Sequence, residues 1–331
     1  MATLGDVAQR SGYAVSTVSH VLNNHASCYA SKTARAAIRE AAEALGYRPH
    51  FFARSLRRLR SFQVGVVGSL FGSEINALQM RSLVDPLRAA GYGILFSDTM
   101  GELGRERAAI DDLLYKCVEG ILLQSYSDGR ELKKIVPDKT PCVLLVERPV
   151  PGALSLVIDR AMAVETAVQL LLRLGHRRIA FLADRLAPNS AKAEGYRRAM
   201  KNAGVLDENL LLECTGAPGC ARDFVTARAA LFGTTTAIVA TNDRLAAEAI
   251  VGLRRIGMQV PDDISVIGFD DTDIVNAVEP PLTTLRQPRA EVGKVGAQML
   301  LDCIAGRQVE NTVLVPQLVE RGSVAPCRRA L

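Results

Sequence analysis

The sequence predicts an α/β protein with a small all-α headpiece, and three observations predict it. In the first sixty residues, apolar side chains recur at helical spacing on both sides of Gly12. From Gln63 onward, short apolar runs alternate with longer amphipathic stretches, and this alternation occurs twice. The chain of 331 residues is also too long for one compact core of ordinary size. We therefore expect two doubly wound subdomains after the headpiece.

The headpiece begins with two short amphipathic helices that meet at a turn. Gly12 separates their apolar positions, which are Leu4, Val7 and Ala8 before it and Ala14, Val18, Val21 and Leu22 after it. Two helices in this arrangement form a helix-turn-helix, and the second helix of such a motif enters the major groove of DNA. Small or short polar side chains at its start let the backbone approach the bases. We expect this face to comprise Val15, Ser16, Thr17, Ser19 and His20.

The basic excess of the chain lies within this headpiece. Residues 1–60 hold nine Lys/Arg and three Asp/Glu, a net charge of +6, whereas the remainder has a net charge of −1. A module that binds the polyanionic backbone of nucleic acid needs such a concentration, and a merely solvated charged face has no reason to show it. A basic tail that only raises solubility is the alternative, and the helix-turn-helix context disfavours it.

A third helix completes the headpiece, and a short basic stretch follows it. Ser31 is predicted to cap a helix that ends near Leu45, with an apolar stripe facing the first two helices. Residues 50–60 have helical propensity among four arginines but are too short to hold a helix alone in water. The stretch therefore folds on a support or remains a flexible linker, and both interpretations can hold in different states.

Several segments carry a resemblance to a known family. The headpiece reads Asp6-Val7-Ala8, Ser16-Thr17-Val18-Ser19 and Val21-Leu22-Asn23, and the pattern continues through Leu45–Pro49 and Ala53–Leu56. Later patches are Leu174–Ala180, Glu194–Tyr196, Thr241–Asp243, Val266–Asp271 and Pro280–Pro288. In this order, over nearly the whole chain, these segments resemble the LacI/GalR (lactose/purine repressor) family of bacterial transcription regulators. The resemblance implies that the core subdomains are Rossmann-like and resemble periplasmic binding proteins.

The resemblance also implies which residues contact operator DNA. Residues 49–61 match the family's hinge helix, which orders on DNA, pairs with its copy in the partner subunit and inserts a leucine, here Leu56, into the minor groove. Two positions depart from the family, because Ala14 replaces a customary serine and His20 a customary arginine. The DNA-contacting set is expected to be Thr3, Val15, Ser16, Thr17, Ser19, His20, Asn23, Tyr47, Arg54, Ser55 and Leu56.

The remainder of the chain is predicted to form two βαβ series with a cleft between the carboxyl ends of their strands. Expected strands are 64–67, 94–97, 120–123 and 142–146 in the first series and 179–183, 210–214, 237–241 and 265–269 in the second. Expected helices are 75–90, 105–117, 128–136, 190–203, 221–232, 244–256 and 290–304. The expected domains are 1–48 for the headpiece, 49–61 for the hinge, 62–157 with 287–316 for the first subdomain, and 158–286 with 317–331 for the second. Three crossings between the subdomains suit a hinge that closes on a ligand.

Signatures of enzymes, metals and membranes are missing from the sequence. The glycines of residues 65–72 lack GxGxxG spacing, and no Walker A, HExxH or GxSxG motif occurs. The seven cysteines are scattered without a CxxC pair, so we expect reduced packing residues rather than disulfides or a zinc site. His176 fits a capping or interface role better than catalysis. No cofactor and no metal are expected, and the lack of an apolar stretch of roughly 20 residues favours a cytoplasmic protein.

Binding is the better interpretation of the cleft, because strand ends present rigid polar groups. Lys192 lies three residues before Gly195, where the resembling family commonly carries an effector-binding arginine. Asn242 has the alternative role of capping the next helix. Of Asp270 and Asp271, only one is expected to face the cleft, since neighbours on a strand point apart. Asp270→Ala should then abolish the ligand response while leaving the melting and the DNA affinity of the ligand-free protein close to those of wild type. The expected effector-binding set is Ser69, Phe71, Glu147, Lys192, Asn242, Asp270 and Gln287.

We therefore expect a ligand-responsive, sequence-specific DNA-binding repressor that acts as a homodimer on a pseudo-palindromic operator. Its effector would be a sugar, a sugar derivative or a nucleobase-like molecule, and because residues 69–76 depart from the family, no known member's effector carries over. Two alternatives stay open, a regulator whose cleft no longer binds a small molecule and a Rossmann-type enzyme with a fused DNA-binding head. No leucine heptad follows Val319, so a tetramerising coiled coil is not expected.

Overall fold

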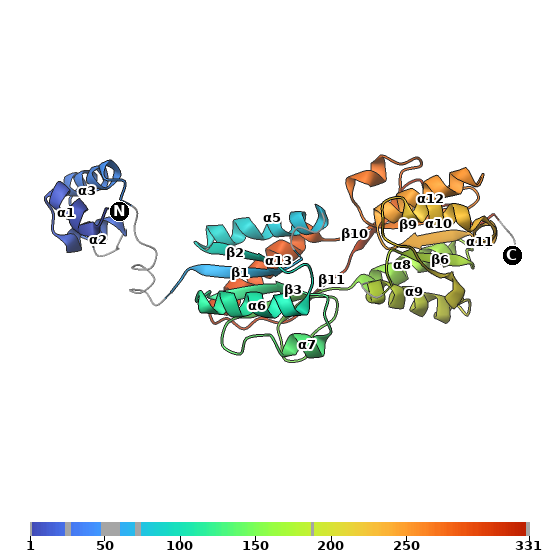
Figure 1. The fold of residues 1–331 in the computed structure, drawn as a ribbon, viewed down its shortest axis with the longest axis horizontal. Helices are drawn as coiled ribbons and strands as arrows, with labels where there is room; N and C mark the ends of the chain where they lie inside the picture. Colours follow the sequence, from blue (N-terminus) through green and yellow to red (C-terminus); the bar gives the residue numbers. More distant parts are fainter. Residues whose placement is uncertain (1, 24–27, 48–59, 70–73, 187–188, 329–331) are drawn as a thin grey trace. The chain divides into compact units, whose positions relative to one another are not determined.

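The computed structural model describes the chain except for residues 1, 24–27, 48–59, 70–73, 187–188 and 329–331 (Figure 1). It divides into two compact units, residues 1–62 and residues 63–331, and each is described by itself. No helix of the described residues is long and apolar enough to cross a membrane.

The described residues of the first unit form three helices, α1 (Leu4–Ser11), α2 (Val15–Leu22) and α3 (Lys32–Ala44). The two predicted short helices and the turn between them are confirmed, since Gly12 ends α1 in the left-handed conformation at φ 74°. Ser31 caps α3 as predicted, with its hydroxyl accepting from the Ala34 N–H at 3.1 Å.

Four fully buried side chains hold the three helices together. Val7 of α1, Val18 and Val21 of α2, and Ile38 of α3 are each 0% exposed and belong to one cluster. This cluster is small, so the caps matter to its stability. At the start of α1, Thr3 accepts from the Asp6 N–H and the Asp6 carboxylate accepts from the Thr3 N–H, which is a complete capping box.

The second unit contains two six-stranded sheets. The first has the order β11-β5-β4-β3-β1-β2, and all of its pairs are parallel. Its strands are β1 (Gln63–Gly68), β2 (Gly93–Asp98), β3 (Gly120–Gln124), β4 (Cys142–Val146), β5 (Ser155–Ile158) and β11 (Thr312–Leu314). Its central strands read as continuous apolar runs because helices cover both faces.

The second sheet has the order β12-β10-β9-β8-β6-β7, and only its β10–β12 pair is antiparallel. Its strands are β6 (Ile179–Ala183), β7 (Leu211–Glu213), β8 (Ala237–Ala240), β9 (Ser265–Asp270), β10 (Thr283–Arg286) and β12 (Gln317–Val319). The chain crosses between the sheets three times, from β5 to β6, from β10 to β11 and from β11 to β12. The predicted α/β core of two doubly wound subdomains is therefore confirmed.

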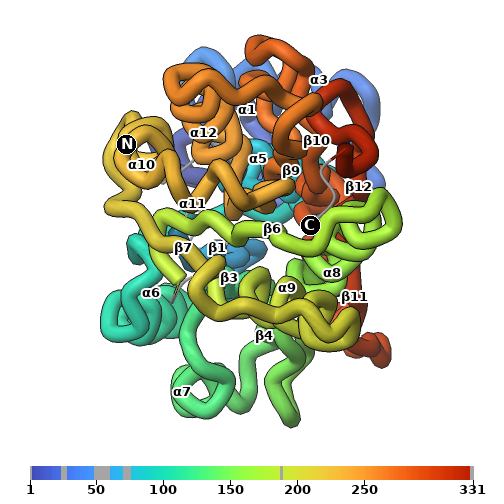
Figure 2. Tube along the Cα trace, turned by 90° about the vertical axis from the view of Figure 1, so that its right-hand side faces the viewer, coloured from blue at the N-terminus to red at the C-terminus, as the bar shows by residue number. Residues whose placement is uncertain are grey.

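Helices cover each sheet on both faces. Around the first sheet lie α5 (Glu74–Ala89), α6 (Leu103–Tyr115), α7 (Gly129–Lys133) and α13 (Arg289–Ile304). Around the second lie α8 (Arg160–Arg173), α9 (Ser190–Asn202), α10 (Cys220–Ala227), α11 (Ala229–Thr234) and α12 (Asp243–Arg255), with the 3-10 turns η2 (Glu208–Leu210) and η3 (Asp273–Asn276). Figures 1 and 2 both show α8 and α9 on one face of the second sheet and α10 and α12 on the other. Each face has its own apolar cluster.

Two glycines allow pairs of helices to approach closely. A Cβ at Gly195 of α9 would overlap the carbonyl oxygen of Ala161 in α8. A Cβ at Gly293 of α13 would lie 2.6 Å from the carbonyl oxygen of Gln79 in α5. Because the obstacle is backbone in both cases, an alanine would push the helices apart. Gly195 thereby sets the position of α9, which carries a candidate site residue.

Some predicted elements were wrong or missing. The predicted helix over 221–232 is broken into α10 and α11, because Arg228 leaves the helical conformation at φ −119° and ψ 37°. The strands β5, β10 and β11 were not predicted, and each has only three or four residues. Helix α8 was not predicted either. A strand of three or four residues is too short to show a clear alternation of apolar and polar side chains. Its pairing with neighbouring strands, rather than its own sequence pattern, therefore decides its conformation.

Candidate functional site

A polar cavity of about 750 Å³ lies where the strand ends of the two sheets meet. Its size suits a small ligand. Among the described lining residues every side chain except that of Ile274 carries a polar group. Five lining side chains are Lys or Arg and five are Asp or Glu. A cavity of this kind offers a ligand many hydrogen-bonding and charged groups.

Lys192 projects into this cavity from the first turn of α9. Its ammonium donates to the carbonyl oxygen of Thr241 at 2.6 Å and stands 4.0 Å from the centroid of the Phe269 ring. Burial lowers the pKa of Lys192 to about 8, although the nearby Asp270 carboxylate opposes this shift. An ammonium has three donors, and Thr241 takes one of them. Lys192 is thus a buried cation that can donate to a ligand.

Asp270, at the end of β9, already has two partners. Its Oδ1 accepts from Nε2 of Gln287 at 2.6 Å and from the Arg289 guanidinium at 2.8 Å. Burial lowers the pKa of Arg289, and the attraction of Asp270 opposes that shift. All three residues line the cavity, so the predicted Asp270 and Gln287 lie together there, and Arg289 joins them.

Asp270 and Asp271 diverge as expected, and the backbone shows why. Both have positive φ angles, 116° and 60°, a conformation that side-chain-bearing residues seldom adopt. Asp271 turns away from the cavity and pairs with Arg321 at 2.7 Å and with Arg286. Such strained conformations persist only where surrounding contacts hold them. The ion pairs on both sides supply those contacts.

Asn242 has the capping role that was its alternative interpretation. Its Oδ1 accepts from the Leu245 N–H at 2.9 Å and caps α12. It also lines the cavity, which leaves its amide donors for a ligand. The next residue, Asp243, was missed from the sequence. Its carboxylate accepts from the N–H of Thr272 at 2.7 Å, and burial raises its pKa to about 6.

At the opposite wall, an ion pair joins the end of β4 in the first sheet to the start of α8. Glu147, which was predicted, accepts from Arg160 at 2.8 Å, and both side chains are more than four-fifths buried. Arg160 was missed because it opens the helix α8, which the sequence pattern did not predict. The backbone oxygen of Ser69, another predicted residue, accepts from the Asn76 amide at 2.6 Å. The predicted Phe71 lies outside the described residues.

Two buried glutamines at this wall have amide atoms without a hydrogen-bond partner among the described residues. These atoms are Nε2 of Gln79 and Oε1 of Gln124. Nε2 of Gln124 donates to the Tyr126 hydroxyl at 3.0 Å, which fixes the orientation of that amide. Gln79 lines the main cavity, and both glutamines line a smaller pocket beside it. Unpaired buried amides are costly unless something binds them, so they are candidate ligand contacts that sequence reasoning missed.

The predicted DNA-contacting face of α2 is mostly exposed. Val15 is 49% exposed, Ser16 and His20 are exposed, and Thr17 is partly exposed. Ser19 requires a correction. It is 3% exposed and lies inside the headpiece beside Val18, with its hydroxyl 3.4 Å from the Asn23 amide. Ser19 therefore supports the packing of α2 rather than presenting a group to a base.

The other predicted DNA contacts have local roles as well. Thr3 caps α1, and Asn23 closes α2 by donating to the Ser19 carbonyl oxygen at 2.7 Å. Tyr47 packs against the apolar cluster of the headpiece and is half-buried. Arg54, Ser55 and Leu56 lie outside the described residues. No group of three or more His, Cys, Asp or Glu side chains that could hold a metal occurs among the residues that are described.

Comparison with known proteins places the chain in a family. Residues 3–50 match the model of bacterial regulatory proteins of the lacI family, and residues 168–324 match a periplasmic binding protein-like domain. The ribose operon repressor of Escherichia coli K12 is 32% identical over 98% of this chain and 100% of its own length. A structure of the Lac repressor dimer bound to operator and the anti-inducer ONPF has a TM-score of 0.89 at 24% identity, covering 98% of this chain and 99% of that one.

A second solved structure is a LacI family regulator from Enterococcus faecium with bound ribose. It has a TM-score of 0.67 at 25% identity and covers 80% of this chain and 100% of that one. The hypothesis of a Rossmann-type enzyme is thereby set aside, because the relatives are transcriptional repressors. The chain belongs to the lacI family of bacterial regulatory proteins and is a DNA-binding transcriptional regulator.

Proposed function

We propose that this protein is a cytoplasmic homodimeric repressor whose release from, or retention on, a pseudo-palindromic operator is set by a neutral sugar in the cavity. The observation that carries the proposal is the charge balance of that cavity. Three of its five cations already have protein partners, Arg160 with Glu147, Arg289 with Asp270, and Arg244 with Glu248. An anionic effector would also meet the carboxylates of Asp184, Asp243 and Asp273, which line the same cavity.

A polyhydroxylated molecule fits the remaining groups. Each hydroxyl both donates and accepts, which matches a wall that offers the Lys192 ammonium, the Asn242 amide and the unpaired Gln79 amide. A nucleobase would need aromatic faces for stacking, and the only aromatic side chain among the described lining residues is Tyr126. The similarity to a ribose operon repressor and to a regulator with bound ribose supports a pentose or hexose.

On the DNA side, we propose that α2 reads base edges through its exposed residues while the headpiece arginines contact phosphate. The dimeric Lac repressor on its operator supports the same arrangement for this chain. The boundaries that accompany this proposal are 1–48 for the headpiece, 49–61 for the hinge, 62–157 with 287–316 for one subdomain, and 158–286 with 317–331 for the other. Effector at the cavity would then act on DNA affinity by favouring one orientation of the two subdomains.

A ligand screen followed by a DNA-binding assay tests the proposal. Thermal melting of the full chain is measured with neutral pentoses and hexoses, sugar acids, sugar phosphates and nucleobases, because a ligand bound only by the folded state raises the melting temperature. We expect a neutral sugar to raise it and to change affinity for a selected operator in fluorescence anisotropy. A response to sugar phosphates or nucleobases alone would contradict the assigned ligand class. Specific DNA binding that no compound alters would indicate a regulator without a small-molecule effector.

A further inference from the structure

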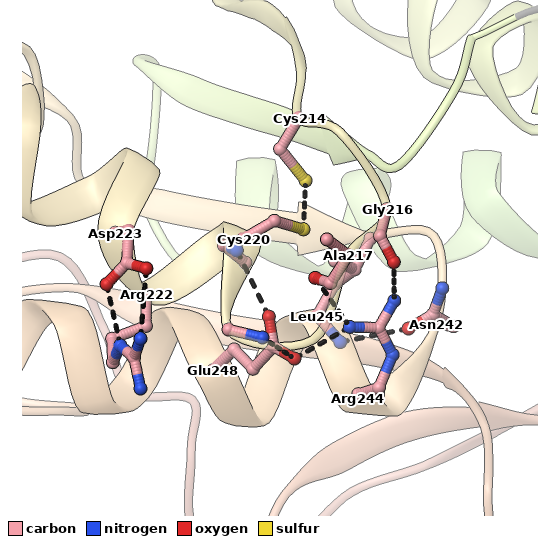
Figure 3. A network of polar contacts seen from close by, with 12 residues as sticks. Cys214, Gly216, Ala217, Cys220, Arg222, Asp223, Asn242, Arg244, Leu245 and Glu248 are labelled. Atoms are coloured by element: carbon pink, nitrogen blue, oxygen red, sulfur yellow. Dashed lines mark hydrogen bonds and ion pairs between the residues drawn. The ribbon is translucent and has the colours of Figure 1, made fainter.

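Two cysteines meet at the edge of the second sheet. Cys214 directly follows β7, Cys220 begins α10, and their sulfur atoms are 3.0 Å apart (Figure 3). Both are free thiols. The short loop between them contains Gly216 and Gly219 with positive φ, which lets the chain double back. Sequence spacing alone gave no reason to pair these residues.

The two thiols have different surroundings. Cys214 is 7% exposed, and burial, followed by its contact with the Cys220 sulfur, raises the pKa of Cys214 to about 12. Cys220 is partly exposed, stands at the N-terminus of α10, and interacts with the Arg244 guanidinium. Cys220 is the more exposed of the two sulfurs and therefore the one that meets an oxidant, and Cys214 is the protonated thiol behind it.

We propose that Cys214 and Cys220 form a redox-active thiol pair that a hydroperoxide converts to an intramolecular disulfide. The Cys220 sulfur attacks one peroxide oxygen, the O–O bond breaks, and the other oxygen takes up the proton of the Cys220 thiol and leaves as water or an alcohol, so that Cys220 becomes a sulfenic acid. The Cys214 sulfur then attacks the Cys220 sulfur, the S–O bond breaks, and the proton of Cys214 leaves with the hydroxyl as water. The two sulfurs lose two electrons in total, and the peroxide gains them.

The bond requires only a small movement, and the contacts show which side moves. A disulfide brings its sulfurs to about 2.05 Å, roughly 1 Å closer than here. The Cys214 N–H donates to the carbonyl oxygen of Ala183 at 2.9 Å, which ties that cysteine to β6. Cys220 sits between two N–H groups, of Gly219 and Ala221, that both donate to the Glu248 carboxylate, at 2.9 and 3.1 Å. Any backbone shift that accompanies the bond therefore falls on the start of α10, against Glu248.

That shift reaches the cavity through Arg244. Its guanidinium donates to Glu248 at 2.7 Å and to the carbonyl oxygen of Gly216, inside the loop between the cysteines, at 3.1 Å (Figure 3). Arg244 also lines the cavity. The loop between the two cysteines is thus joined to the cavity by a single residue, Arg244. The thiol chemistry itself does not depend on which ligand the cavity binds.

The experiment uses the full chain treated with hydrogen peroxide, followed by thiol counting and peptide mass spectrometry without reduction. We expect the free thiols to fall by two and a peptide linking Cys214 to Cys220 within one chain, reversed by dithiothreitol. Cys220→Ser and Cys214→Ala should each lose the link, and Cys214→Ala should leave Cys220 as a sulfenic acid that dimedone captures. The control Cys117→Ser removes an exposed thiol elsewhere and should still form the link.

Two results would overturn the proposal. One is a wild-type chain that keeps both thiols at a peroxide concentration sufficient to oxidise the exposed Cys117. The other is a Cys214→Ala variant in which Cys220 gains no dimedone adduct although its melting matches wild type. Cys220→Ser changes a partly exposed position and Cys214→Ala a buried one. If one of these variants fails to fold, the other still tests the proposal.

Discussion

Replacing Asp270 with alanine should destabilise the ligand-free protein, contrary to what its place in the sequence suggests. If the acidic side chain had no partner in the ligand-free protein, its removal would not lower the stability of that protein. The structure instead pairs Asp270 with Arg289 at 2.8 Å, and their side chains are 9% and 10% exposed. Asp270→Ala would leave the Arg289 guanidinium buried without a carboxylate. The expectation from sequence, that ligand-free stability is spared, is therefore replaced.

The magnitude follows from burial and separation. Two charges about 4 Å apart attract by about 4 kcal/mol at an effective dielectric constant of about 20, and the cost of removing both from water offsets most of that. Removing one partner of a buried pair costs about 3 to 5 kcal/mol, since the other charge remains buried. Arg289 borders the cavity, where water can partly reach it, so the lower end applies. A loss of about 3 kcal/mol corresponds to a melting temperature lower by about 6 to 12 °C.

Differential scanning calorimetry of a double-mutant cycle measures this coupling. Asp270→Asn keeps the shape and an acceptor for Gln287, so it should lose less stability than Asp270→Ala. Asp270→Ala combined with Arg289→Met removes both charges and should recover most of the loss. If the double variant instead loses the sum of the two single losses, the pair is not coupled and the reasoning fails.

Three further predictions follow from single contacts. Burial lowers the pKa of Lys192 from an ordinary 10.5 to about 8, so the unfolded chain binds more protons between these two pH values and the stability of the folded protein should rise with pH there. Effector affinity should fall above pH 8 in wild type, because the ammonium loses its charge, but not in Lys192→Arg. Titration calorimetry across pH checks this, and a flat wild-type profile would contradict it. Thr3→Ala should lower headpiece stability by about 1 kcal/mol in denaturant unfolding through loss of the capping box, and no change would contradict that role. His20→Arg should sharpen preference for guanine opposite that position in binding-site selection, and an unchanged consensus would refute it.

The fold was largely predictable because the hydrophobic pattern of most segments agrees with the helix or strand that each forms in the folded protein. The strand 142–146 and the strand 179–183 were predicted with their observed bounds, since each is a buried apolar run between turns. The turn at Gly12 was predictable from its composition. The short strands β5, β10 and β11 were not, because partners on the sheet rather than the segment itself determine them. The break at Arg228 has no local breaker such as Gly or Pro.

The cavity was predictable only in part, for a related reason. Lys192, Asp270 and Gln287 were found because they sit in recognisable segments. Their partners were not, since Arg289 and Arg160 are paired with residues of other elements and nothing in the sequence marks those pairs. Ser19 shows the opposite error. Its polar side chain suggested a DNA contact, but Ser19 lies on the side of α2 that faces the interior of the headpiece.

The buried ion pairs also bear on how a ligand would act. Glu147 follows β4 of the first sheet, and Arg160 opens α8, which packs against the second. Asp270 ends β9 of the second sheet, and Arg289 opens α13, which packs against α5 of the first. Both pairs therefore span the two subdomains and also line the cavity. A ligand placed among them must exchange contacts with groups that now hold one orientation. Its effect on DNA affinity is limited to the difference in its affinity for the two orientations, typically about 1 to 3 kcal/mol.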